Sequence, residues 1–323
     1  SGQINSNSFA PREAFTAGTN PQHLAIGDLD GDGKPDIVVS NNNSSISIFR
    51  NISTGGVITA NSFANKVDIA LTHSSSMLAI ADLNGDGKPE LAVHIPNGGI
   101  AIYRNVTSLG NITENSFIHE TTFGSNIYNF SVADLNGDGK PDFATAVFVP
   151  NTNTVSVFLN SNTEPSFSGN SFRNAINFTT TGNAGIAIGD IDGDELPDLI
   201  SIGPTTLSIL RNTTSTNNLT SVSFAPKVDF TLGQNYHSVA ISDINGDGKP
   251  DIVAAASLLP QTITVLRNIS SPGTISTSSF ATKLDFTSNA PGTKISINDL
   301  DGDGKPDIVS GNNGPSSGPI AAL

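Results

Sequence analysis

The stretch Asp28-Leu-Asp-Gly-Asp-Gly-Lys-Pro-Asp36 decides the fold, because close copies of it recur along the whole chain. Oxygen-bearing side chains occupy positions 1, 3, 5 and 9 of the stretch, with small or turn-forming residues between them. Ca²⁺ takes about six to eight oxygen ligands and accepts irregular geometry, so a short loop of this composition is typical of a calcium site. Glycines at positions 4 and 6 allow the positive φ angles of a tight wrap, and the proline at position 8 leads into an apolar run.

The loop occurs six times, at 28–36, 82–90, 134–142, 190–198, 243–251 and 299–307. A set of Asx-rich surface turns is the alternative interpretation, and six copies in register argue against it. With the backbone carbonyl of position 7 included, the candidate ligands of up to six Ca²⁺ ions are Asp28, Asp30, Asp32, Lys34, Asp36, Asp82, Asn84, Asp86, Lys88, Glu90, Asp134, Asn136, Asp138, Lys140, Asp142, Asp190, Asp192, Asp194, Leu196, Asp198, Asp243, Asn245, Asp247, Lys249, Asp251, Asp299, Asp301, Asp303, Lys305 and Asp307.

An EF-hand is the main competing calcium motif, because its loop also opens with D-x-D-x-D-G. Its bidentate glutamate at position 12 is missing from every copy, and no amphipathic helices flank the loops. The residues found at position 12 are Val39, Val93, Thr145, Ser201, Ala254 and Ser310. The sequence therefore argues against an EF-hand.

The net charge agrees with this interpretation. Of the 29 acidic residues, 21 lie at ligand positions of the loops, so six Ca²⁺ ions would offset most of the formal charge of −14. The acidity is thus explained by ligand chemistry and does not indicate a basic partner. Without metal the clustered carboxylates repel one another, and we expect marked calcium-dependent stability. Only 15 residues are Lys or Arg, which argues against nucleic acid.

The composition predicts a soluble all-β protein. Asn, Ser, Thr and Gly are abundant, helix-forming residues are scarce, and no stretch of 18 or more apolar residues suggests a membrane span. No secretory signal is visible at the N-terminus. Cysteine is absent, so calcium rather than disulfides is expected to stabilise the fold. Weak calcium sites suit the millimolar calcium outside cells, and we expect an extracellular or cell-surface location.

The repeat length predicts a β-propeller. The first Asp of each loop recurs at intervals of 54, 52, 56, 53 and 56 residues, the range of a four-stranded blade. Apolar alternation predicts an innermost strand before each loop (24–27, 238–241), a second strand after it (37–39, 199–202) and a third (45–49, 262–266). A fourth strand is expected to begin near recurrent Ser-Phe pairs, whose aromatic residues are Phe9, Phe63, Phe117, Phe172, Phe224 and Phe280.

The two ends of the chain are predicted to meet in one blade. The chain starts with a fourth-type strand at 8–16 and ends after a third-type strand at 319–323. Joining them would close the ring and hide an open sheet edge. We therefore expect one domain over residues 1–323, a six-bladed propeller of four-stranded antiparallel blades.

These motifs resemble the integrin-alpha-type FG-GAP, or VCBS, repeat family, whose blades carry a D-x-[DN]-G-D-G-x-x-D loop. The resemblance covers essentially the whole chain and implies that each loop joins the first and second strands of a blade and binds Ca²⁺ on one face of the propeller. Glu90 replaces the last Asp of the second loop, which could change its denticity, and Glu195 replaces a glycine of the fourth. The Phe-Gly and Gly-Ala-Pro motifs for which the family is named are largely absent, so kinship to integrins proper is distant.

The opposite face is the expected ligand surface. Its loops, which precede the first strand or join the second and third, contain no Asp or Glu, which argues against glycoside hydrolysis and most acid–base catalysis. We expect a protein that is not an enzyme. Asn, His and Tyr suit sugar hydroxyls, although the lack of Trp weakens a carbohydrate site. The candidate ligand-binding residues are His23, Asn42, His73, His94, Tyr128, Asn151, Tyr236 and His237.

Two binding functions stay open on this sequence. A lectin-like module would bind a glycan, whereas an adhesion or scaffold module would bind an extracellular protein; a polysaccharide lyase is the least favoured reading. The domain is expected to be monomeric and could belong to a larger surface protein. Arg-Asn-x-Ser/Thr recurs at Asn51, Asn105, Asn212 and Asn268 and matches a glycosylation sequon. Because it recurs at the end of the third strand, a structural turn is the preferred interpretation.

Overall fold

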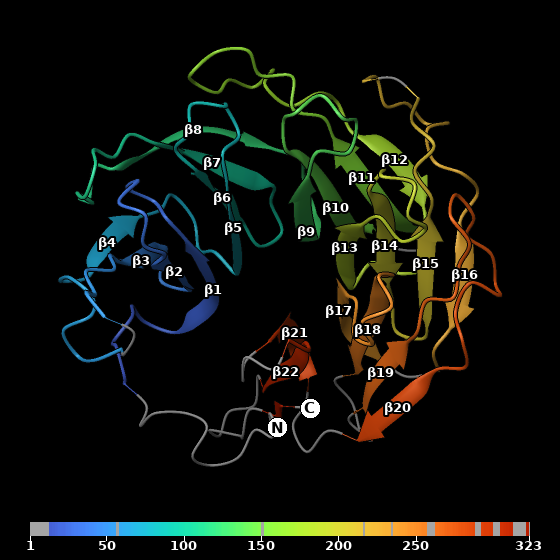
Figure 1. Cartoon of the computed structure of the whole chain (residues 1–323). Coiled ribbons are helices and arrows are strands. Elements are labelled where there is room, and N and C mark those ends of the chain that lie inside the picture. The colour runs from blue at the N-terminus through green and yellow to red at the C-terminus, as the bar shows by residue number, and fades with distance from the viewer. Residues whose placement is uncertain are drawn as a thin grey trace. The chain divides into compact units, whose positions relative to one another are not determined.

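The computed structural model describes residues 13–55, 58–149, 152–215, 217–233, 235–256, 262–287, 292–299, 304–312 and 321–322. Within these ranges the regular secondary structure is entirely β, in five four-stranded sheets and one three-stranded sheet (Figure 1). No helix of the described chain is long and apolar enough to cross a membrane. The residues group into two compact units, a first unit of 13–127 with 158–175 and a second unit of 128–157 with 176–322.

The first unit holds two sheets whose strand order follows the chain. Each is an antiparallel meander, in which every strand pairs with its sequence neighbour. The strands are β1 (Pro21–Gly27), β2 (Asp36–Asn41), β3 (Ser45–Phe49) and β4 (Val67–Ala70) in one sheet, and β5 (Met77–Ala81), β6 (Glu90–His94), β7 (Ile100–Asn105) and β8 (Phe117–Phe123) in the other.

The second unit repeats the same meander, again with consecutive strands as neighbours. Its last sheet has three strands within the described residues, and the short β23 pairs with β22 where a third-type strand was predicted. The strands are β9 (Ile127–Ala133), β10 (Asp142–Val149), β11 (Thr152–Phe158), β12 (Ile176–Thr179), β13 (Gly185–Gly189), β14 (Asp198–Ile202), β15 (Thr206–Leu210), β16 (Val228–Thr231), β17 (Tyr236–Ser242), β18 (Asp251–Ala256), β19 (Thr262–Leu266), β20 (Leu284–Thr287), β21 (Gly292–Asn298), β22 (Asp307–Asn312) and β23 (Ala321–Ala322).

The predicted first, second and third strands are confirmed, and the fourth begins later than expected. In most repeats the Ser-Phe aromatic is not in the fourth strand but forms an isolated bridge with the asparagine that follows the third strand, such as Asn51 with Phe63. The strand then starts a few residues further on, at Val67 in the first repeat; β8 is the exception, because it begins at Phe117 itself. Residues 8–12 of the predicted N-terminal strand lie outside the described residues, and 13–16 are not in a strand.

Aromatic side chains pack between consecutive repeats. A phenylalanine at the fourth-strand position packs against the Ser-Phe aromatic of the next repeat, with ring centroids 4.2 to 5.1 Å apart. The sheet interiors between them consist of fully buried β-branched and leucine side chains, among them Ile46 and Ile48 of β3 and Leu91 of β6. The pairs are Phe15 with Phe63, Phe123 with Phe172, Phe178 with Phe224 and Phe230 with Phe280.

Candidate metal centre

Each acidic loop joins the first and second strands of its sheet, as the family resemblance implies. In the first loop, which runs from the end of β1 to the start of β2, the carboxylate of Asp28 accepts hydrogen bonds from Gly31 N at 2.8 Å and Gly33 N at 2.9 Å. Both glycines have positive φ angles, 75° and 83°, so a side chain at either position would strain the backbone. The position 1 carboxylate therefore closes the loop on itself.

The same closure recurs in the other loops. Asp82, Asp134 and Asp243 each accept from the two glycines of their own loop. In the fourth loop Glu195 replaces the second glycine and still donates its N–H to Asp190, at a φ of 69°. A glutamate in this left-handed conformation is strained, because its side chain crowds the backbone where glycine would not.

The carboxylate at position 9 ties the loop to the end of the third strand. Asp36 is buried, and its two oxygens accept from Leu29 N at 3.0 Å and Asn51 N at 2.8 Å. Glu90 makes the equivalent bonds to Leu83 N and Asn105 N, so its extra methylene is accommodated without a change of partners. Burial raises the pKa of Asp36 to about 6 and that of Glu90 to about 7, against the opposing effect of the backbone donors.

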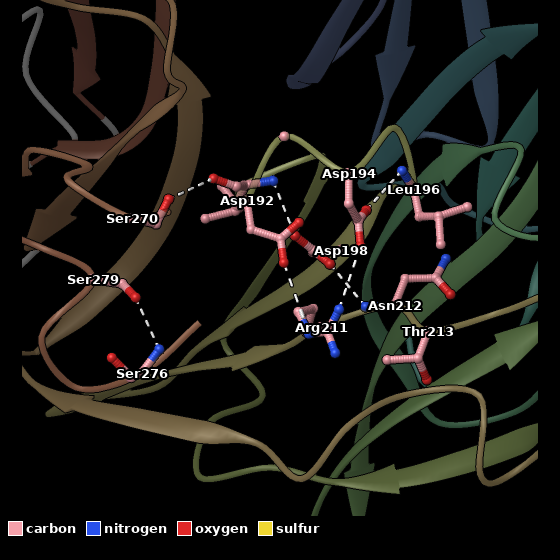
Figure 2. Close-up of polar contacts among 12 residues, drawn as sticks. Asp192, Asp194, Leu196, Asp198, Arg211, Asn212, Thr213, Ser270, Ser276 and Ser279 are labelled. Carbon is pink, nitrogen blue, oxygen red and sulfur yellow. Dashed lines mark hydrogen bonds and ion pairs between the residues drawn. The ribbon is translucent and has the colours of Figure 1, made fainter. Parts of the chain in front are cut away.

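The strongest metal-like feature is a set of buried carboxylate oxygens without hydrogen bonds. Ligand atoms of Asp190, Asp192 and Asp194 lie within 4.8 Å of one another, and so do those of Asp28, Asp30 and Asp36. Asp192 is 3% exposed, yet neither of its carboxylate oxygens accepts a hydrogen bond within the described residues. The dashed line from its carboxylate to Arg211 in Figure 2 is an ion pair at 3.7 Å.

Asp30 repeats this arrangement in the first loop, where it is 4% exposed and its Oδ2 is unsatisfied. Burial, with Asp194 and Asp190 adding to it, raises the pKa of Asp192 to about 6. Buried carboxylate oxygens that accept no hydrogen bond are costly unless they coordinate a metal, so the donor sets of these two loops fit Ca²⁺.

The loops with asparagine at position 3 are arranged differently. In the second loop Asn84 Nδ2 donates to Asp86 Oδ2 at 3.2 Å and to the carbonyl of Pro165 at 2.9 Å. Asn136 does the same with Asp138 and the carbonyl of Asn217. Their amide nitrogens thus tie the loop to the segment that follows the third strand of the next repeat. The amide oxygens accept backbone N–H groups within the loop, at 2.9 Å from Asp86 in the second loop.

Two of the position 7 lysines bond to carbonyls outside their loops, which leaves their own carbonyls as the candidate ligands. Lys88 Nζ donates to the carbonyl of Thr107 at 2.7 Å, and Lys249 Nζ to that of Ser270 at 2.6 Å. The sixth loop is described in part: Asp299 Oδ2 accepts from Gly304 N, whereas Asp301 and Asp303 lie outside the described residues.

The recurrent Arg-Asn-x-Ser/Thr asparagine is a link between repeats. Asn212 is fully buried, and its Nδ2 donates to Pro197 O of its own repeat at 3.1 Å and to Leu135 O of the preceding one at 2.9 Å. Its Oδ1 accepts from Thr214 N and Thr214 Oγ1. Asn105 and Asn268 repeat both contacts, and Asn160 reaches the carbonyl of Leu83. The predicted structural role is confirmed, because a buried, doubly bonded amide is not accessible for glycosylation in the folded protein.

Two of the predicted ligand-binding residues are interior residues instead. His94 is 4% exposed and contacts Ser76 Oγ and the carbonyl of Ile127, each at 2.7 Å. Tyr236 is 0% exposed, and its hydroxyl lies 2.6 Å from Thr264 Oγ1. Both come directly beside loops, and the sequence did not reveal that their side chains turn inward to satisfy polar groups of the sheet.

The other predicted ligand-binding residues remain at the surface or partly buried. Asn42 and His73 are exposed in the first unit, where His23 is half-buried in β1. In the second unit Tyr128 is 53% exposed, and the half-buried His237 contacts Asn235 Nδ2 at 3.1 Å. Asn151 lies outside the described residues. The predicted ligand-binding surface therefore has fewer exposed residues than the sequence predicted.

The fold and loops define a repeat protein of propeller-like blades with an acidic loop in each. The FG-GAP-like repeat pattern matches residues 28–93, 82–145, 134–201 and 190–254, which together span more than half of the chain. The chain therefore belongs to the FG-GAP-like repeat family. A comparison with curated proteins found no match.

Solved structures with a similar fold include two of the polycomb repressive complex 2 of Chaetomium thermophilum. A chain of the humanized mutant bound to the inhibitor GSK126 has 15% identity and a TM-score of 0.60, over 91% of this chain and 65% of that one. A chain of the crystal structure of the complex has 14% identity and a TM-score of 0.56, over 90% and 63%. This chain thus spans less than two thirds of their length, and the likeness concerns the fold alone.

Proposed function

We propose that this protein is a calcium-stabilised binding module and not an enzyme. The observation that carries the proposal is the unsatisfied, buried carboxylate of Asp192, matched by that of Asp30 in the first loop. Side-chain oxygens at positions 1, 3, 5 and 9, which are carboxylates except for the asparagines at position 3 of three loops, and the carbonyl of position 7 would hold each Ca²⁺. The bound cation would supply charge compensation that joins the first two strands of a sheet. Millimolar extracellular calcium would fill such sites, which supports a location outside the cell.

Calcium removal tests this proposal directly. The full chain is dialysed against EDTA, its thermal unfolding is followed by circular dichroism, and Ca²⁺ is then restored in steps while bound metal is counted by isothermal titration. We expect a lower Tm in EDTA, full recovery with Ca²⁺, and up to six ions per chain. Mg²⁺ at the same concentration is the control, because it demands tighter octahedral geometry and is expected to restore less. An unchanged Tm in EDTA would contradict the proposal.

We further propose that the sheets are six blades of one propeller domain, closed by the N-terminal segment. Phe15 already packs on Phe63 at 5.0 Å, in the way that Phe178 of a fourth strand packs on Phe224 of the next repeat. At the other end of the series Phe286 is 42% exposed. Phe9 belongs to a Ser-Phe pair that precedes the first repeat, so no earlier repeat supplies a partner for its ring. In a closed ring, Phe9 would cover Phe286.

Closure predicts that Phe9→Ala lowers the Tm although Phe9 is near a terminus, where substitutions are usually neutral. Phe286→Ala should cost a similar amount, and the double variant no more than the larger single effect, because both remove one contact. Additive effects would refute the contact. Deletion of residues 1–12 should also destabilise the protein and promote association through the open sheet edge, measured by light scattering.

The binding surface proposed for a partner is the end of the sheets opposite the calcium loops. A glycan is the first candidate, supported by the exposed Asn42 and His73 and by the absence of acidic residues from these loops. A protein partner is the second, supported by Tyr128, a large aromatic that is 53% exposed, since exposed aromatics are enriched at interfaces.

A glycan array probed with the calcium-loaded protein separates the two candidates. Specific binding to one sugar family, lost in Tyr128→Ala and retained in the control Val222→Ser, would establish the glycan function. Val222 is the appropriate control because it is 83% exposed in the same unit but lies on the segment between a third and a fourth strand. An array without binding, from protein that is stabilised by calcium, would contradict the glycan function and leave the protein partner.

A further inference from the structure

Two of the acidic loops have an arginine beside them. Arg50 Nη1 lies 3.7 Å from Asp30 Oδ2 and 3.8 Å from Asp32 Oδ2. In the fourth repeat Arg211 Nε lies 3.7 Å from Asp192 Oδ2, and its Nη1 lies 3.4 Å from Asp194 Oδ2 (Figure 2). Each arginine follows the third strand of its own repeat and therefore reaches the loop between the first two strands of the same sheet.

The arginine contacts a loop only where position 3 is charged, within the part of the chain that the structure describes. The second loop has Asn84 at position 3, and the equivalent Arg104 pairs with Glu120 at 2.5 Å instead. The third loop has Asn136, and Leu159 replaces the arginine. Charge balance explains this pattern. A loop with four carboxylates at its ligand positions would have a net charge of −1 with one Ca²⁺ and one arginine. A loop with three carboxylates reaches the same net charge with one Ca²⁺ alone.

These contacts balance charge without satisfying the buried oxygens. The side chains of Asp30 and Asp192 have no exposed surface, whereas those of Arg50 and Arg211 are 26% and 27% exposed. Separations of 3.7 Å exceed hydrogen-bond lengths, and Asp30 Oδ2 and both oxygens of Asp192 accept no hydrogen bond within the described residues. The lone pairs of these oxygens therefore remain available to coordinate a cation in the loop.

A turn from the next repeat covers each of these two loops. Gly110 N approaches the carbonyl of Asp30 at 3.4 Å, and Gly273 N donates to that of Asp192 at 3.2 Å. Both glycines have positive φ angles, 69° and 73°. The position 3 residue is thus held from both sides, by its neighbour's turn on the backbone and by the arginine on the carboxylate, so little reorganisation is required when a cation enters.

We propose that Arg50 and Arg211 are built-in counter-ions that compete with Ca²⁺ at loops 28–36 and 190–198. The proposal rests on the calcium-binding function above. Without metal, each guanidinium offsets the repulsion within the four-carboxylate cluster and keeps the loop folded. With metal, the guanidinium and Ca²⁺ repel each other across the shared carboxylates, which lowers the affinity of these two sites. The arginines thus exchange calcium affinity for stability of the metal-free protein.

The proposal predicts opposite effects on affinity and on metal-free stability. Arg50→Gln or Arg211→Gln should lower the dissociation constant of its own loop by about fivefold to tenfold, the effect of removing one positive charge roughly 5 Å from a divalent ion in a water-like dielectric with salt screening. The same change should lower the Tm in EDTA, because the four carboxylates then lose the cation that contacts two of them. A residue that merely positions the ligands would weaken calcium binding instead.

Site-resolved titration of the full ¹⁵N-labelled chain tests this. The amide resonances of Gly31 and Gly193 report on the two loops, because each N–H donates to the position 1 carboxylate, and Gly85 reports on a loop without an arginine. Arg104→Gln is the matched control, since its arginine stands at the same repeat position but contacts Glu120. We expect Arg50→Gln to shift only the Gly31 midpoint to lower Ca²⁺, and Arg211→Gln only that of Gly193.

The outcomes separate this inference from the calcium-binding function. If no glycine amide of the wild-type protein responds to Ca²⁺, both fail. If the wild-type loops bind Ca²⁺ but the variants bind it equally or more weakly, the counter-ion proposal alone is overturned. A variant that folds only with Ca²⁺ present supports the proposal, because the metal then replaces the missing charge.

Discussion

Substitution of Asn212 by alanine should destabilise the protein strongly, although the residue lies outside every acidic loop. The change removes two hydrogen bonds from Nδ2, to Leu135 O at 2.9 Å and Pro197 O at 3.1 Å. It also removes the acceptor of Thr214 N at 3.0 Å and of Thr214 Oγ1 at 2.6 Å. Asn212 is 0% exposed, so water cannot replace these bonds without opening the contact between two repeats.

The expected loss follows from the groups left without partners. Two carbonyls, one N–H and the Thr214 hydroxyl lose their bonds. The hydroxyl can rotate to another partner, whereas each of the other three buried groups, if left unsatisfied, costs about 1–3 kcal/mol. Pro197 is partly exposed, so its carbonyl regains water and lies at the low end of the range. We therefore expect a loss of about 3–5 kcal/mol in the free energy of unfolding, a large share of the about 5–15 kcal/mol that stabilises a typical domain.

Urea unfolding in saturating Ca²⁺, followed by circular dichroism, measures this loss. Asn174→Ala is the control, because Asn174 is exposed and its side chain makes no hydrogen bond within the described residues. Asn212→Asp keeps the Oδ1 acceptor but places an oxygen against two carbonyls, so it should cost at least as much as alanine. If Asn212→Ala unfolds within about 1 kcal/mol of the wild type with an unchanged m-value, the inter-repeat bonds do not contribute as argued.

Three further predictions concern the loops and the outer strands. Glu195→Gly should raise the free energy of unfolding by about 1 kcal/mol, because glycine adopts the φ of 69° without strain; a loss in urea unfolding would contradict this. Asp28→Ala and Asp134→Ala should each lower the Tm without affecting ligand binding at the end of the sheets opposite the acidic loops. If a folded variant lost that binding, the proposed separation of the calcium loops from the ligand surface would be wrong. Although burial opposes it, hydrogen bonds from lysine and hydroxyl groups lower the pKa of Asp68, Asp229 and Asp285. Their folded pKa values thus lie below the unfolded value of about 3.9, so their stabilisation is complete above about pH 5 and is lost as the pH falls below 4. Asn177 occupies the equivalent position in the third repeat, so asparagine is the natural replacement for the three aspartates. The triple Asp→Asn variant should lose less stability between pH 7 and pH 3 than the wild type. The difference should be under about 1 kcal/mol per site, because the carboxylates are exposed.

The local features of each repeat could be predicted because they depend on nearby residues. Period-two alternation located the first three strands, and the loop pattern located every turn between the first two. The fourth strand was placed too early, because Phe63 resembles a strand residue but is bridged to Asn51 instead. His94 and Tyr236 were assigned to a ligand surface because polar residues near loops are usually exposed, and the structure places both in the interior.

The class of fold, the repeat length and the candidate calcium ligands could all be read from the amino-acid sequence, since a loop that wraps a cation needs its oxygens within nine consecutive residues. Which groups meet across repeats became clear only from the folded chain. Asn212 bonds to a carbonyl 77 residues away, and the arginine that contacts a loop comes from the segment directly after the third strand of the sheet. Such contacts depend on the stacking of whole sheets and on the direction of buried side chains. No short-range pattern encodes either, because the interacting residues are neighbours in space and not in the chain.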